Sequence, residues 1–187
     1  KLEKKTRHDV NAYIDNVSKY IGKQSKYFHH GVTSSDIIDT GFSIQLKQTG
    51  EIISKELKIL LKNLKSKSLK YKKTAMIGRS HGIHAEPITF GLKLASFYNE
   101  FKRNLKRLEL AIDEISICSI SGPVGTYNTI DPRVEKYVAN KLKLKTENVS
   151  TQIIPRDRHA FFFSILGIIA SSIERFAVEI RHLQRTE

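Results

Sequence analysis

Apolar residues recur every three or four positions along most of the chain, and this spacing predicts amphipathic helices. Four helices are expected, over residues 33–64, 87–112, 131–142 and 157–185. Hydroxyl and carboxyl groups at Thr33 to Asp36 and at Asp131 can cap two of these helices, and Pro87 suits the first turn of another. No alternating strand pattern flanked by hairpin turns is evident, so the chain is predicted to be all-α.

The predicted long helices carry apolar stripes that indicate which faces are covered. The stripe of the first helix begins at Ile37, Ile38 and Phe42, which we expect to face the core. Helices of about 30 residues measure roughly 45 Å, at about 1.5 Å per residue, and such lengths favour an elongated bundle. The last helix is apolar around much of its circumference, so we expect the bundle to self-associate through its long helices.

The longest nearly unbroken apolar run, residues 160–170, is shorter than the roughly 20 residues that a membrane-spanning helix needs. A membrane is therefore not an expected partner. The single cysteine, Cys118, lies in an apolar stretch and is interpreted as a core thiol. A chain without an internal disulfide suits a reducing compartment, and a cytoplasmic location is expected.

Lys and Arg outnumber Asp and Glu by 32 to 19, a net charge of +13 that suits phosphate-rich partners. The basic residues concentrate in residues 55–73 and 102–107, where Leu and Ile separate them at helical spacing. This arrangement is typical of solvated helix faces. A nucleic-acid-binding or scaffold module is the alternative from another class, but no recognition motif supports it, so nucleic acid is not an expected partner.

Polar side chains that could carry chemistry gather in clusters at residues 6–9, 33–36, 78–87 and 150–159. His81 and His84 could share a zinc ion, but no HExxH motif or thiolate set completes such a site. The G-x-S-x-G motif of many serine hydrolases is also absent. We therefore expect neither a metal nor another cofactor.

Taken together, the clusters resemble the bacterial-type adenylosuccinate lyases of the fumarase and aspartase superfamily. The resemblance rests on Thr-Arg-His-Asp-Val from Thr6, His-His-Gly-Val-Thr-Ser-Ser-Asp from His29, Gly-Arg-Ser-His-Gly-Ile-His-Ala-Glu-Pro from Gly78, Ser-Gly-Pro-Val-Gly-Thr-Tyr from Ser121, Ser-Thr-Gln from Ser150 and Arg-Asp-Arg-His-Ala from Arg156. Ser35, Ser80 and Pro123 depart from the usual Thr, Thr and Ala without changing a charge. Sister lyases acting on argininosuccinate, fumarate or aspartate are a weaker alternative, because they usually carry Thr-His-Leu-Gln in place of Ser-His-Gly-Ile.

The resemblance implies a β-elimination that releases fumarate from adenylosuccinate, giving AMP, and from the succinylated aminoimidazole carboxamide ribotide of purine biosynthesis. It implies that His81 is the general acid and that His8 binds and orients the substrate. Arg7 and Asp9 would contact the nucleotide portion. Thr33, Ser34 and Gln152 would supply neutral hydrogen bonds. No role is assigned to His84, Arg156, Arg158 or His159.

The resemblance also implies a domain organisation and an assembly. Residues 1–33 would end an N-terminal helical domain, and residues 34–187 would form the first part of a central long-helix bundle. Members of the family are homotetramers whose active sites combine segments of three subunits. Their catalytic base is a serine in a loop of the form Gly-Ser-Ser-x-Met-Pro-x-Lys-x-Asn, which would follow Glu187 and is not in this chain. We therefore expect the chain to be inactive by itself.

Overall fold

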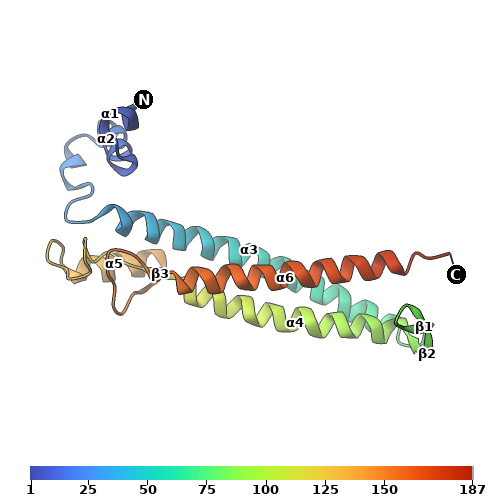
Figure 1. The fold of residues 1–187 in the computed structure, drawn as a ribbon. Coiled ribbons are helices and arrows are strands. Elements are labelled where there is room, and N and C mark those ends of the chain that lie inside the picture. The colour runs from blue at the N-terminus through green and yellow to red at the C-terminus, as the bar shows by residue number, and fades with distance from the viewer. Residues whose placement is uncertain (187) are drawn as a thin grey trace. The chain divides into compact units, whose positions relative to one another are not determined.

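A computed structural model describes residues 1–186, which are mostly helical (Figure 1). In chain order the elements are α1 (Leu2–Thr6), α2 (Asp9–Ile21), the 3₁₀ helix η1 (Gly22–Tyr27), α3 (Ser34–Lys70), β1 (Ala75–Ser80), β2 (Ile83–Thr89), α4 (Phe90–Ile115), β3 (Ile117–Cys118), α5 (Pro132–Leu142), β4 (Lys145–Thr146) and α6 (Asp157–His182). The long helices dominate, and the predicted all-α class with its long-helix bundle is confirmed.

The described residues form two compact units. Residues 1–45 and 116–155 make the first, and residues 46–115 together with those from 156 onward make the second. Helix α3 begins in the first unit and ends in the second. The predicted domain boundary at residue 33 concerns the organisation of a longer polypeptide, and it stays a prediction.

The second unit is a helical bundle in which α4 and α6 run side by side (Figure 1). Its core joins apolar side chains of α3, α4 and α6, and Phe101, Leu108 and Phe162 are completely buried. At Gly50 of α3, an added Cβ would come within 2.5 Å of the Ile112 side chain. The helices therefore pack closely through side-chain interdigitation, as the apolar spacing of this part of the chain predicts.

A β-hairpin, which the sequence pattern did not indicate, connects α3 to α4. Strands β1 and β2 pair antiparallel with an irregularity between Ile77 and Arg79. Pro87 pairs with Ile77 inside β2, so the prediction that Pro87 opens a helix is wrong, and α4 begins at Phe90. Both strands of a two-stranded sheet are edge strands, and an edge strand tolerates a proline that has no N–H to donate.

The first two turns of α3 present their polar side to the interior of the first unit. Asp36, Asp39, Thr40 and Ser43 are buried, at the i, i+3, i+4 and i+7 positions of one helix face. The predicted core residues Ile37, Ile38 and Phe42 are instead exposed, so that part of the stripe was assigned to the wrong face. The apolar core of this unit is correspondingly small, built on Cys118, Ile120, Ala139 and Leu144.

Helix α5 begins as predicted. The Asp131 carboxylate accepts a hydrogen bond from the backbone N–H of Arg133 at 2.8 Å, which is the expected N-cap. The Arg133 guanidinium also binds this carboxylate and lowers the pKa of Asp131 to about 2. The cap therefore stays ionised at any pH well above that value.

Helix α6 is long and apolar enough, by length and composition, to cross a membrane, and 22% of its most apolar window is buried. The apolar run considered in the sequence was shorter than this helix because isolated polar residues interrupt it. Phe162, Ile165 and Ile169 pack in the core of the second unit. Phe163, Ile168 and Ile173 remain exposed on other sides of α6, so the single chain leaves several of the helix's apolar side chains uncovered.

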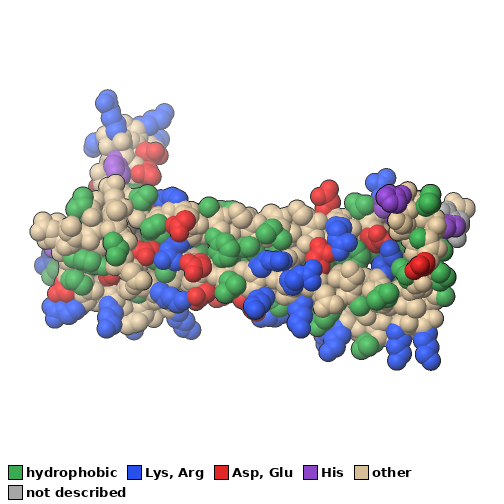
Figure 2. Space-filling model, turned by 60° about the horizontal axis from the view of Figure 1, so that its bottom comes forward, with side chains coloured by type: hydrophobic (Ala, Val, Ile, Leu, Met, Phe, Trp, Pro, Cys, Tyr) green, Lys and Arg blue, Asp and Glu red, His purple; other side chains and the backbone are tan. Residues whose placement is uncertain are grey.

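Basic side chains on the second unit are partly neutralised by acidic side chains of neighbouring helices. Lys93 of α4 pairs with Glu179 of α6 at 2.5 Å, and Arg175 of α6 pairs with Glu100 of α4. On the face shown in Figure 2, Lys and Arg side chains occur in small groups separated by acidic and apolar ones. This distribution agrees with solvated helix faces.

Replacing Leu108 by alanine tests the core of the second unit, with Leu110 as a matched control on the same helix. Leu108 is fully buried and Leu110 is 54% exposed. Leu108→Ala should lower the free energy of unfolding by about 2–5 kcal/mol, whereas Leu110→Ala should change it by about 0.5 kcal/mol. Urea unfolding followed by circular dichroism measures both. Equal losses in the two variants would show that α4 does not bury the predicted face.

Candidate active site

The Thr-Arg-His-Asp motif lies at the break between α1 and α2. Arg7 adopts a left-handed conformation with φ of 53° and ends α1, and His8 is the N-cap of α2. The Thr6 hydroxyl donates to the His8 carbonyl at 2.9 Å and accepts from the His8 backbone N–H at 3.4 Å. The local backbone therefore holds His8 at the helix entrance, while the Arg7 and Asp9 side chains are exposed on either side.

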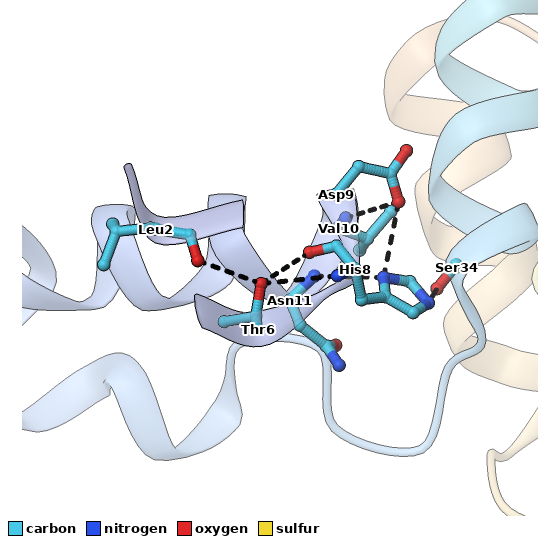
Figure 3. Close-up of polar contacts among 7 residues, drawn as sticks. All are labelled: Leu2, Thr6, His8, Asp9, Val10, Asn11 and Ser34. Carbon is cyan, nitrogen blue, oxygen red and sulfur yellow. Dashed lines mark hydrogen bonds and ion pairs between the residues drawn. The ribbon is translucent and has the colours of Figure 1, made fainter. Parts of the chain in front are cut away.

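The His8 imidazole lies between α2 and the start of α3 (Figure 3). Its Nε2 is 3.5 Å from the Ser34 hydroxyl. Its Nδ1 accepts from the backbone N–H of Asn11 at 3.4 Å and lies 3.3 Å from the Asp9 carboxylate. Nδ1 accepts the Asn11 bond when it carries no hydrogen and can donate to Asp9 when it carries one, so the tautomer of the ring decides which of the two contacts is a hydrogen bond.

Thr33 and Ser34 stand at the entrance of α3, partly buried. The carboxylate of Asp36 accepts from the Thr33 backbone N–H at 2.9 Å, and the Asp36 N–H donates to the Thr33 carbonyl at 3.1 Å. A carboxylate three residues into a helix that returns to the preceding N–H is one half of a capping box. The expected carboxyl cap is confirmed, and it comes from Asp36.

The Ser-Gly-Pro-Val-Gly-Thr-Tyr segment is held in place by two buried carboxylates. Asp36 accepts from the backbone N–H groups of Ser121 and Gly122, each at 3.2 Å. Glu135 of α5 accepts from the Ile120 N–H at 2.8 Å and from the Tyr127 hydroxyl at 2.7 Å. These bonds fix both ends of the loop that runs from residue 120 to residue 127.

Gln152 is exposed on a loop that is itself tied to this segment. The hydroxyls of Ser150 and Ser119 lie 2.7 Å apart, and the Ile154 N–H donates to the Asp39 carboxylate at 2.9 Å. A Cβ on Gly125, whose φ is +81°, would lie 2.2 Å from the Ser150 carbonyl oxygen. Only glycine permits this close approach, so Gln152 sits on a loop packed directly against its neighbour.

His81 occupies the tip of the hairpin in the second unit. His81 and Gly82 have φ values of 54° and 78°, the pair of positive angles that a type I′ turn requires. A left-handed conformation is uncommon for a residue other than glycine, and such residues cluster at functional sites. The imidazole is exposed. His84 faces Arg79 across the hairpin and is also exposed.

The structure thus brings some of the predicted site residues together within one unit. His8 and Ser34 make direct contact, Arg7 and Asp9 flank His8, and Thr33 adjoins Ser34. Gln152 belongs to the same unit, and His81 belongs to the other. Within residues 1–186, no group of three or more His, Cys, Asp or Glu side chains is arranged to hold a metal ion.

Arg158, to which the sequence assigned no role, has a structural one. Its guanidinium donates to the Glu114 carbonyl at 3.0 Å and to the Glu114 carboxylate at 2.9 Å. This contact fastens the first turn of α6 to the last turn of α4 inside the second unit.

Sequence reasoning missed the buried acids Asp36, Asp39 and Glu135 as organising residues. A signal was available for two of them, because Asp36, Asp39, Thr40 and Ser43 repeat at helical spacing on one face. The sequence indicated only a capping role for Asp36 and no role for Asp39, Thr40 or Ser43. Glu135 carried no comparable signal.

Comparison with known proteins shows the family to which the chain belongs. The family model described as "Lyase" matches residues 1–187, so the chain belongs to this lyase family. The adenylosuccinate lyase of Thermotoga maritima is 52% identical over 187 residues, and that of Bacillus subtilis is 51% identical over 186. The chain spans 43% of the length of each.

A solved structure shares the fold. A fumarate lyase from Mesorhizobium sp. BNC1 superimposes with a TM-score of 0.90 at 28% sequence identity, covering 98% of this chain and 44% of that one. The overall fold described above is therefore shared with part of a lyase of known structure.

Titration of Tyr127 tests the carboxylate that holds the loop. Burial, and then the hydrogen bond to Glu135, raise the pKa of Tyr127 to about 12. The folded state thus holds this proton more tightly than the unfolded state, and the associated stability is full below about pH 10 and lost as pH rises through about 12. Phenolate absorbance, with Tyr127→Phe as the reference, should show the high pKa, and Glu135→Gln should lower it. A Tyr127 that titrates with the exposed tyrosines would contradict the loop geometry.

Proposed function

We propose that the chain supplies part of the active site of an adenylosuccinate lyase, which eliminates fumarate from adenylosuccinate and from the corresponding succinylated ribotide. The observation that carries the proposal is the contact of His8 with Ser34, which joins two motifs far apart in sequence. The high identity to two adenylosuccinate lyases along the whole chain supports it.

The proposed reaction needs an acid that protonates the departing purine nitrogen and a base that removes a proton beside a succinyl carboxylate. We assign the acid to His81, because an imidazole can donate a proton and this one is exposed at a turn. The base is assigned to a segment outside this chain. Each proton transfer then has its own group, and the two groups need not come from one polypeptide.

Substrate orientation is assigned to the first unit. Ser34 and Thr33 offer hydroxyls beside the His8 imidazole, and Gln152 offers an amide from the neighbouring loop. Neutral donors and acceptors fix the orientation of a substrate without adding charge. Arg7 contributes a cation suited to the phosphate or carboxylate groups of the substrate, and Asp9 sets the orientation of His8.

Self-association is part of the proposal. Phe163, Ile168 and Ile173 are exposed on different sides of α6, and burying these apolar side chains against other copies is favourable. A homotetramer built through the long helices would cover them and bring His81 of one subunit to residues of another. We place the assembled enzyme in the cytoplasm, in keeping with a buried, unpaired Cys118.

Replacing His81 by alanine tests the proposed acid, in a full-length form of the protein that carries this chain within a polypeptide of its relatives' length. A general acid acts in the transition state, so kcat for adenylosuccinate should fall about 10²- to 10⁴-fold with little change in substrate binding. The loss of adenylosuccinate absorbance measures turnover.

His84→Ala is the matched control, since His84 is an exposed histidine of the same hairpin. It should retain most of the turnover. A fall of less than about fivefold in His81→Ala, set against the usual contribution of acid catalysis, would assign protonation to another residue. A full-length protein that does not convert adenylosuccinate at all would overturn the proposed function.

A further inference from the structure

We propose that Asp36 is a positioning residue of the active site, one that holds Thr33 and Ser34 where they meet the substrate. This inference rests on the proposed function. In this proposal Asp36 contacts neither the substrate nor a catalytic group. It acts by fixing the position of the first residues of α3.

The carboxylate of Asp36 is 1% exposed and binds two segments that are far apart in sequence. One oxygen accepts from the N–H groups of Thr33 and Gly122, at 2.9 and 3.2 Å, and the other accepts from Ser121 at 3.2 Å. A single side chain therefore fixes the residue before Ser34 against the loop at residues 121–122. Burial raises the pKa of Asp36, and these N–H bonds oppose that rise.

The geometry links this clamp to His8. Ser34 follows Thr33 directly, and its hydroxyl reaches the His8 Nε2 at 3.5 Å, the outer limit of a hydrogen bond. A shift of a few tenths of an ångström at Thr33 therefore breaks or makes the contact. The position of the Ser34 hydroxyl depends on where Asp36 holds the start of the helix.

Glu135 is a suitable control, because its loss should affect stability without moving Thr33 or Ser34. It is also a buried carboxylate, 4% exposed, and it also accepts a backbone N–H of the same loop, that of Ile120. Its other partner is the Tyr127 hydroxyl, and it makes no hydrogen bond to Thr33 or Ser34 in the described structure. Loss of either carboxylate weakens the loop, but only the loss of Asp36 releases the Thr33 N–H.

The substitution Asp36→Asn keeps the shape of the side chain and replaces one of its two acceptor oxygens by an NH₂ group. An amide offers one acceptor oxygen and one NH₂ donor group, so in either orientation the NH₂ faces a backbone N–H. Glu135→Gln is the matched amide change on α5, but its amide oxygen can keep the Ile120 N–H while its NH₂ donates to the Tyr127 hydroxyl oxygen. Asp36→Asn should therefore lose more stability than Glu135→Gln, because only Asp36→Asn leaves a buried N–H without an acceptor.

The experiment compares KM and kcat for adenylosuccinate in the full-length protein. A purely structural loss reduces the fraction of folded enzyme, which lowers the apparent kcat and leaves KM unchanged. Asp36→Asn should raise KM about tenfold, the effect of about 1.4 kcal/mol of lost binding, and Glu135→Gln should leave KM at the wild-type value. In the double variant Asp36→Asn with Ser34→Ala, the two effects on KM should be less than additive.

Three outcomes overturn the inference. Equal KM values in Asp36→Asn, Glu135→Gln and the wild type would make Asp36 purely structural, while leaving the proposed function intact. Fully additive effects with Ser34→Ala would show that Asp36 does not act through Ser34. A wild-type enzyme inactive on adenylosuccinate would remove the proposed function and this inference with it. If Asp36→Asn does not fold, Asp36→Glu keeps the charge, displaces the carboxylate by one methylene, and should raise KM in the same way.

Discussion

A buried carboxylate near the start of α3 is the interaction on which the rest of the first unit depends. Asp36 accepts hydrogen bonds from three backbone N–H groups, and it sits where the apolar core is small. Burying a charge is costly unless charge-assisted hydrogen bonds offset the lost hydration. Backbone N–H groups of the two loops supply those bonds, and the buried N–H groups of Ser121 and Gly122 gain an acceptor in return.

This constraint explains why the first part of α3 buries its polar face and exposes its apolar one. Its polar side chains face the interior, where they bind the backbone of the loops, so Ile37, Ile38 and Phe42 lie at the surface. Further along the same helix the pattern returns to normal, and Leu57 and Leu64 pack in the bundle core. One helix thus performs two tasks, organising the candidate site at one end and forming an apolar core at the other.

The sequence predicted the bundle well because the apolar spacing of α4 and α6 and the Asp131 cap of α5 are local signals that packing reinforces. The sequence prediction was wrong for Pro87, which lies in a strand, and for Ile37, which is exposed, because tertiary contacts determine the structure at both positions. The residues of β1 run from apolar to polar without alternating, and Gly78 is the only buried residue of the two strands, so no regular buried apolar face marks the hairpin. The buried face of α3 is polar because distant backbone groups require acceptors, and local periodicity carries no information about distant groups. The resemblance to a family supplied the site residues, while the structure supplied the His8–Ser34 contact and the hydrogen bonds of Asp36.

The central claim, that this chain contributes His81 to a shared lyase site, is tested most directly by complementation. The chain is refolded together with the Bacillus subtilis adenylosuccinate lyase in which the histidine equivalent to His81 is replaced by alanine, and mixed oligomers are confirmed by mass. The account predicts that these oligomers convert adenylosuccinate faster than either protein alone, and that the same chain carrying His81→Ala restores nothing. Mixed oligomers that are no more active with His81 than with His81→Ala would contradict the claim.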